Sequence, residues 1–198
     1  MRVDVAAFKA ACPTCQLLQN ARRQERSVSI VPARPFIDLS VDILSLSPVD
    51  DDGNDCVVVI VDNFTGWTEL SPSKSKTAEA VVRRLVDYFG RYGAPVVVRT
   101  DQGPAFDSEV MDAFNKAANI VPNRAIPHHH QAAGVVERLN QEVLQLVSAM
   151  VLDERVVIDV LLGWSDVLPF VQRIINSSVT RKTGFSPSQL LFGDAVDL

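Results

Sequence analysis

The stretch Phe36-Ile-Asp-Leu-Ser-Val-Asp-Ile-Leu44 alternates apolar and polar side chains with the two-residue period of a β-strand. Its aliphatic residues at 37, 39, 41 and 43 share one face, while Asp38, Ser40 and Asp42 share the other. The pattern therefore predicts a strand on which the carboxylate of Asp42 points away from the most apolar face.

Two further acidic residues occupy positions that suit a shared site with Asp42. Asp101 directly follows the apolar run Val96-Val-Val-Arg-Thr100, and Glu137 lies early in an amphipathic helix predicted from Val135 onwards. Carboxylates on two strands and one helix can converge on one point, and three carboxylates there form a magnesium or manganese site for phosphoryl transfer. A nucleic-acid enzyme is therefore the first hypothesis.

Taken singly, each of these acids has an ordinary structural explanation. Asp42 suits the exposed face of a strand, Asp101 suits a turn, and Glu137 suits a solvated helix face. The metal site is favoured only by the combination, because the three acids come from different elements that a fold can bring together.

The rest of the chain predicts further strands and helices in alternation. A strand at 56–61, buried on both faces, turns at 62–66 into a strand at 67–70, which gives three antiparallel strands. A helix then leads to the strand at 96–100, and this crossover places that strand parallel in the sheet. The crossover helix is expected to begin at Ser75 or Thr77 and to end at Gly90 or Gly93. A second helix is predicted from Asp107 or Ser108 to Ala118, followed by a weak strand at 120–126 and a loop at 127–134. A last helix is predicted from about Val157 to Asn176.

Length and composition suit one globular α/β domain. The 198 residues are 47% hydrophobic and 22% charged, which is enough apolar material for a core without a disulfide or metal staple. The longest apolar runs are too short to cross a bilayer, and the N-terminus lacks the pattern of a secretory signal. We therefore expect an intracellular protein that has no membrane partner.

Charge divides the chain into two parts. The net charge is −5, but residues 1–34 carry six Lys and Arg against two Asp and Glu, whereas the remainder carries 13 against 22. This division favours a basic lead-in at 1–34 and an acidic domain at 35–198. Cys12 and Cys15 supply half of a four-ligand zinc site, and no histidine precedes them, so zinc is not expected in this chain. Cys56 is interpreted as a core residue.

Five groups of residues carry a resemblance to a known family. They are Phe36-Ile-Asp-Leu-Ser-Val-Asp42, Val59-Ile-Val-Asp-Asn-Phe-Thr-Gly-Trp67, Thr100-Asp-Gln-Gly-Pro-Ala-Phe106, His129-His-Gln-Ala-Ala-Gly-Val-Val-Glu-Arg-Leu-Asn140, and Asn176 with Thr183-Gly-Phe-Ser-Pro187 and Leu191-Phe-Gly193. In these residues the chain resembles the retroviral-type integrase catalytic core, most closely that of Gypsy-type long-terminal-repeat retrotransposons. The groups occur in family order, and the separation of Asp101 from Glu137 by 35 residues is the family's own.

The resemblance implies a ribonuclease-H-like fold, in which helices flank a five-stranded mixed sheet. It implies that Asp42, Asp101 and Glu137 bind two Mg²⁺ or Mn²⁺ ions and catalyse DNA 3′-end processing and strand transfer into target DNA. The implied partners are the DNA ends of a transposable element and the target DNA. They would be bound by a homodimer or higher oligomer that acts in the nucleus.

Other residues at matched positions are expected to bind DNA or to be remnants. The expected DNA-binding residues are His129, Gln131, Arg138, Gln141 and Gln145. Cys12 and Cys15 match the end of the family's N-terminal zinc-binding module and are interpreted as its remnant. The histidines at 128–130 are disfavoured as a metal cluster, because Mg²⁺ prefers oxygen ligands and adjacent loop residues do not all face one ion.

Two departures from the family leave other functions open. Thr180 stands where Gypsy-type integrases commonly have histidine, and His130 stands where they commonly have proline. Together with the acidic balance of 35–198, these departures support a second hypothesis: a catalytically silent or host-adopted integrase-like domain that binds nucleic acid or protein. An RNA-cleaving relative with the same fold is a further alternative, which the residues from His129 to Asn140 disfavour.

Overall fold

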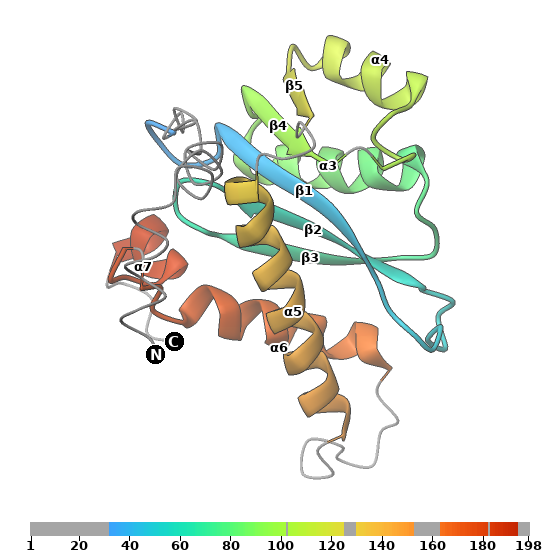
Figure 1. The fold of residues 1–198 in the computed structure, drawn as a ribbon, viewed down its shortest axis with the longest axis vertical. Coiled ribbons are helices and arrows are strands. Elements are labelled where there is room, and N and C mark those ends of the chain that lie inside the picture. The colour runs from blue at the N-terminus through green and yellow to red at the C-terminus, as the bar shows by residue number, and fades with distance from the viewer. Residues whose placement is uncertain (1–31, 102, 125–129, 153–162, 182, 194–198) are drawn as a thin grey trace, which may run out of the picture. The chain divides into compact units, whose positions relative to one another are not determined.

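A five-stranded sheet forms the centre of the domain in the computed structural model (Figure 1). The structure describes residues 32–101, 103–124, 130–152, 163–181 and 183–193, with the backbone alone at 124, 130–136 and 152. The strands are β1 (Asp38–Ser45), β2 (Cys56–Asp62), β3 (Thr68–Ser73), β4 (Val97–Thr100) and β5 (Val121–Arg124). The helices are α3 (Ala78–Tyr92), α4 (Glu109–Ala117), α5 (His130–Leu152), α6 (Trp164–Ser177) and α7 (Pro187–Phe192).

The sheet is mixed, with strand order β3-β2-β1-β4-β5. Strands β1, β2 and β3 pair antiparallel, whereas β4 pairs parallel with β1 and β5 pairs parallel with β4. The helix α3 makes the crossover between β3 and β4, as a parallel strand requires. This arrangement confirms the predicted fold class, a five-stranded mixed sheet flanked by helices.

Helices cover both faces of the sheet, and two apolar clusters fill the space beneath them. Leu39 and Val41 of β1 pack in the cluster under α3 and α4. Val59 of β2 packs in the other cluster, under α5 and α6. Asp42 pairs with Val59 across the sheet, so its side chain lies on the α5 face and away from Leu39 and Val41. The predicted orientation of Asp42 is therefore confirmed.

Two of the predicted helix starts have the expected polar caps. The Thr77 hydroxyl accepts a hydrogen bond from the backbone N–H of Ala80, and the Ser108 hydroxyl accepts one from that of Met111. Gly93 ends α3 with φ of +87°, a left-handed value that favours glycine. The residues that cap these helices were therefore identifiable from sequence.

The limits of α5 and α6 differ from the prediction. The helix α5 begins at His130, inside the stretch predicted as a loop up to Gly134. That stretch lacks apolar periodicity, but its alanines are strong helix formers, and propensity decides where packing does not. The helix α6 begins at Trp164, after Gly163, which donates its N–H to the Asp166 carboxylate at 3.0 Å. The first part of the predicted helix, from Val157 to residue 162, lies outside the described residues.

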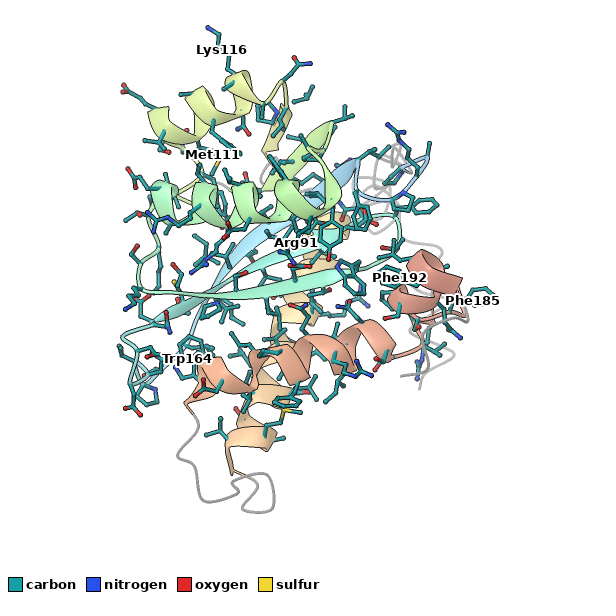
Figure 2. All side chains as sticks on the ribbon, turned by 180° about the vertical axis from the view of Figure 1, so that it is seen from behind. Arg91, Met111, Lys116, Trp164, Phe185 and Phe192 are labelled. Atoms are coloured by element: carbon teal, nitrogen blue, oxygen red, sulfur yellow. The ribbon has the colours of Figure 1, made fainter. Side chains whose placement is uncertain are left out.

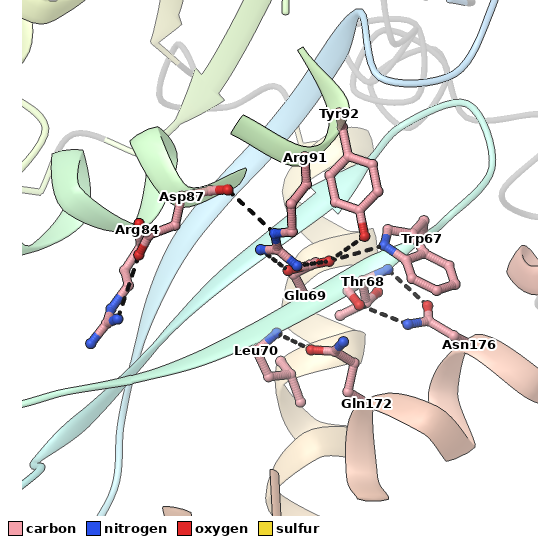
Figure 3. Close-up of polar contacts among 10 residues, drawn as sticks. All are labelled: Trp67, Thr68, Glu69, Leu70, Arg84, Asp87, Arg91, Tyr92, Gln172 and Asn176. Atoms are coloured by element: carbon pink, nitrogen blue, oxygen red, sulfur yellow. Dashed lines mark hydrogen bonds and ion pairs between the residues drawn. The ribbon is translucent and has the colours of Figure 1, made fainter. Parts of the chain in front are cut away.

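The helix α6 lies along β3, which is an edge strand of the sheet (Figure 3). The Asn176 side chain accepts from the backbone N–H of Thr68 and donates to its carbonyl, both at 2.8 Å. The Gln172 side chain accepts from the N–H of Leu70 at 2.8 Å. Because these side chains satisfy backbone groups that have no neighbouring strand, they protect β3 against pairing with another chain.

A buried carboxylate joins α3 to the same strand (Figure 3). Glu69 is 4% exposed and accepts two hydrogen bonds from the Arg91 guanidinium, at 2.9 and 2.6 Å. The Tyr92 hydroxyl donates a third at 2.7 Å, and burial, together with the Glu69 carboxylate, raises the pKa of Tyr92 to about 12. Glu69 is thus a fully partnered structural acid.

A hydrogen bond from the Trp164 side chain fixes the start of α6. Figure 2 shows Trp164 at the start of α6 and Phe192 beyond its other end, on α7. The indole N–H of Trp164 donates to the Pro48 carbonyl at 2.9 Å, which ties α6 to the connection between β1 and β2.

Cys56 is buried as predicted. None of the helices within the described ranges is long and apolar enough to span a membrane.

Candidate metal-binding active site

Asp42 is held between its own strand and α5. Its Oδ1 accepts from the backbone N–H of Ile43 at 2.8 Å, and its Oδ2 accepts from the side-chain amide of Asn140 at 2.7 Å. Asn140 lies on α5, three residues after Glu137, so the two residues share one helix face. The hydrogen bond between Asp42 and Asn140 therefore fastens the helix that carries Glu137 to the strand that carries Asp42.

The register of two parallel strands brings Asp101 to the level of Asp42. The paired residues of β1 and β4 run from Asp38 with Val97 to Ser40 with Arg99. The pairing ends there; extended by two residues on each chain, the same register would bring Asp42 opposite Asp101. Asp42 lies within β1, which continues to Ser45, and Asp101 directly follows Thr100, the last residue of β4. Because adjacent strands lie about 4.8 Å apart, this extension predicts that the two acids are neighbours.

The loop after β4 turns tightly around the carboxylate of Asp101. Asp101 is exposed, and its Oδ1 accepts from the backbone N–H of Gly103 at 2.9 Å. A side chain at Gly103 would place its Cβ 3.0 Å from that oxygen. Glycine at this position therefore permits the loop to approach Asp101, whose side chain remains exposed.

The third acid, Glu137, is exposed on α5. Among the residues whose side chains the structure describes, no three His, Cys, Asp or Glu side chains lie close enough to hold a metal ion. The fold thus brings Asp42 and Asp101 to one level and ties Glu137's helix to Asp42. It does not gather the three carboxylates into one cluster.

The donor atoms at this site fit a hard divalent cation. Carboxylate oxygens are the protein ligands that Mg²⁺ and Mn²⁺ prefer. The Asn140 Oδ1, on the amide that contacts Asp42, is buried and has no hydrogen-bond partner in the described parts of the chain. A buried amide oxygen without a partner suits a water molecule or a hydrated ion beside Asp42.

The residues predicted to bind DNA are only partly described. Gln141 and Gln145 are exposed on α5, one and two turns after Glu137. Arg138 is exposed on the same helix and has an interaction partner. The side chains of His129 and Gln131 lie outside the described residues, as do Cys12, Cys15 and the predicted boundary of the lead-in within 1–34. These assignments stay predictions.

Two contacts at this site were not foreseen from the sequence. Asn140 ends the segment His129 to Asn140 that resembles the family, and its spacing of three residues from Glu137 is a signal that could have indicated a shared helix face. Arg99 forms an ion pair with Asp38, at 2.7 Å, on the α5 face of the sheet. No sequence pattern identifies this pairing, because it depends on the register of β1 against β4.

Comparison with known proteins agrees with this geometry. Residues 32–130, half of the chain, match the family model described as "Integrase core domain". The chain is 29% identical over 195 residues to the Pro-Pol polyprotein of feline foamy virus and 31% identical over 201 residues to that of simian foamy virus type 3 (strain LK3). Each alignment covers 98% of this chain and 16% of the relative's length.

Solved structures share the fold at lower identity. The magnesium-bound, dimeric form of the HTLV-2 integrase catalytic core aligns with a TM-score of 0.63 and 21% identity, over 80% of this chain and 97% of that one. A chain of the simian T-cell lymphotropic virus intasome, in complex with the PP2A regulatory subunit B56 gamma, aligns with a TM-score of 0.70 and 21% identity, over 85% and 58%. With the match to the family model, these findings show that the chain belongs to the integrase core domain family.

Proposed function

We propose that this chain is the catalytic core of an integrase-type polynucleotidyl transferase, which processes DNA 3′ ends and joins them to target DNA. The observation that carries the proposal is the position of Asp42 on β1 and of Asp101 directly after the parallel strand β4, with the helix of Glu137 bonded to Asp42 through Asn140. The viral polyproteins similar to this chain support it, and we infer that the chain derives from a related element, of the Gypsy type by its sequence resemblance.

Asp42, Asp101 and Glu137 would hold two Mg²⁺ or Mn²⁺ ions. Bound ions of this kind activate the attacking hydroxyl and stabilise the charge on the leaving oxygen. The chain's own groups prepare the carboxylates: the N–H of Ile43 and the amide of Asn140 orient Asp42, and the N–H of Gly103 orients Asp101. The HTLV-2 integrase core, which shares this fold, is described in complex with magnesium.

The expected partners are DNA and further copies of the chain. Arg138, Gln141 and Gln145 lie exposed on α5 beyond Glu137, where DNA held at the site would pass. The HTLV-2 core is described in dimeric and trimeric forms. We infer a homodimer or larger assembly that acts on nuclear DNA.

A catalytically silent domain is the second candidate. The surplus of acidic residues after residue 34 opposes DNA, whose binding normally depends on Lys and Arg contacts to phosphates. The described residues also contain no preassembled group of three metal-binding side chains. A silent domain would keep the fold and the surfaces that bind partners without needing divalent ions.

Strand transfer by the full-length protein separates the two candidates. The wild type is incubated with Mg²⁺ or Mn²⁺ and DNA that mimics the element's ends, beside Asp42→Asn, Asp101→Asn and Glu137→Gln. We expect each substitution to reduce strand transfer by at least about a thousandfold, because each removes a metal ligand.

The matched control is Glu142→Gln, which changes an exposed acid on the same helix as Glu137. It is expected to retain wild-type activity. Equal activity in the wild type and all three site variants would refute the catalytic proposal, and no activity in any protein would favour the silent domain.

A further inference from the structure

A buried ion pair lies next to the candidate site on the same face of the sheet. The Arg99 guanidinium of β4 donates from Nε to Asp38 Oδ1 and from Nη2 to Asp38 Oδ2, both at 2.7 Å. The Asp38 side chain is 6% exposed and that of Arg99 27%. Two parallel hydrogen bonds of this kind fix both the position and the orientation of the guanidinium.

Other side chains hold the Asp38 carboxylate in place. The Asn63 amide donates to Asp38 Oδ1 at 2.7 Å, and the backbone N–H of Asn63 donates to the Asp38 carbonyl at 2.9 Å. The Ser40 hydroxyl donates to the Asn63 side-chain oxygen at 2.9 Å. The network joins β1 to the turn after β2, so Asp38 offers Arg99 a carboxylate that cannot easily move.

Arg99 stands midway between two aspartates of the neighbouring strand. Its register partner on β1 is Ser40, and Asp38 and Asp42 lie two residues to either side of Ser40. Side chains alternate along a strand, so all three residues of β1 face α5. A diagonal neighbour two residues away is within reach of a long side chain. The guanidinium can therefore approach either aspartate, and in the structure it binds Asp38.

We propose that Asp38 is a positioning residue that holds Arg99 away from Asp42 and Asp101, so that these carboxylates stay free for divalent cations. The inference rests on the proposed function, because it assigns Asp38 a role only if Asp42 binds metal. Arginine keeps its charge at any physiological pH. A guanidinium paired with Asp42 would occupy the oxygens that a metal ion needs and would repel the ion.

A purely structural role for the ion pair predicts a different outcome. Arg99 belongs to the last recorded pair between β1 and β4, so the ion pair also secures the end of that short ladder. If this were its whole role, the double variant without either charge would bind metal no better than the variant that lacks Asp38 alone. If Asp38 restrains Arg99, removal of Arg99 repairs the loss caused by removal of Asp38.

The test measures Mn²⁺ binding to the full chain by isothermal titration calorimetry. Wild type, Asp42→Asn, Asp38→Asn and the double variant Asp38→Asn with Arg99→Met are compared after circular dichroism has shown that each is folded. We expect Asp38→Asn to weaken Mn²⁺ binding by at least about tenfold, since the freed charge lies beside the ion. The double variant is expected to return to within about threefold of wild type, because the competing guanidinium is gone.

Each result decides one of the two proposals. Wild type that binds no Mn²⁺, or that binds it as Asp42→Asn does, overturns the proposed function and this inference with it. If Mn²⁺ binding needs Asp42 but is unchanged in Asp38→Asn, this inference alone is overturned. The same holds if the double variant binds Mn²⁺ as weakly as Asp38→Asn does. If Asp38→Asn does not fold, Arg99→Gln replaces it: binding at least as tight as wild type supports the inference, and tenfold weaker binding contradicts it.

Discussion

The two ends of the β1 and β4 pair use their acids in opposite ways. At one end Asp38 is buried, and its carboxylate receives three hydrogen bonds from Arg99 and Asn63. At the other end Asp42 is only half-buried, and Asp101 is exposed and accepts a hydrogen bond from the backbone N–H of Gly103. A carboxylate that is fully partnered serves the fold, whereas one with open oxygens is available to a ligand.

Removal of Arg99 is expected to give the largest loss of stability. Arg99→Met leaves the buried Asp38 carboxylate without its guanidinium, which should lower the free energy of unfolding by about 3 kcal/mol. Chemical denaturation measures the change. The matched control is Arg91→Met, because the Arg91 side chain is 51% exposed against 27% for Arg99, so its ion pair with a buried acid is better solvated and should contribute less. An equal loss in both variants would show that the ion pair of Arg99 with Asp38 contributes no more to stability than that of Arg91 with Glu69.

Loss of the edge contact is expected to have the next largest effect. Asn176→Leu removes both hydrogen bonds to the backbone of Thr68 and leaves two buried polar groups without partners, a cost of about 2 kcal/mol. Exposure of the β3 edge should also raise aggregation, which light scattering detects. Ser177→Ala, a change at an exposed hydroxyl that bonds only within its own helix, serves as the control. Unchanged stability of Asn176→Leu would refute the protective role of α6.

Asn140→Ala tests the contact at the open end of β1. It removes the hydrogen bond to Asp42 and should lower the free energy of unfolding by about 1 kcal/mol. We expect strand transfer to fall by roughly tenfold in kcat with little change in KM, because Asp42 loses its orientation while the DNA contacts remain. Glu142→Gln, a change at an exposed residue of the same helix, should show neither the stability loss nor a kcat effect. A rise in KM alone would show that Asn140 binds DNA instead of positioning Asp42.

The exposed acids Asp101 and Glu137 should matter least for stability. Asp101→Asn and Glu137→Gln change exposed side chains, so the free energy of unfolding should stay within about 0.5 kcal/mol of wild type. Thermal unfolding in the absence of divalent ions measures this. A loss above about 1 kcal/mol would mean that these acids have structural partners, against the contrast with Asp38.

Sequence patterns predicted the strands well because burial on two faces leaves a strong signal. The alternation at 36–44 and the apolar run at 56–61 both became strands, and the caps at Thr77 and Ser108 were correct. The start of α5 was missed because its first residues lack apolar spacing. The predicted last helix runs through Gly163, whereas in the structure Gly163 precedes the first turn of α6.

The side chains around the candidate site were harder to predict from sequence. Asp42 lies on β1 and Asp101 directly follows β4, as the sequence pattern predicted, whereas their role in a metal site stays a prediction. The contact of Asn140 with Asp42 and the pairing of Arg99 with Asp38 depend on register and helix rotation, which a single sequence does not specify. The sequence led us to expect three converged acids. In the described parts of the chain the carboxylates of Asp42, Asp101 and Glu137 do not form one cluster.

A crystal structure of the chain with Mn²⁺ would show whether Asp42 and Asp101 bind a divalent cation together, since anomalous scattering locates the ion. We expect an ion bound by the carboxylates of both Asp42 and Asp101, at oxygen distances of about 2.1 Å, with Glu137 turned towards it. An ion bound elsewhere, for example at the histidines of 128–130, or no ion at saturating Mn²⁺, would contradict this expectation.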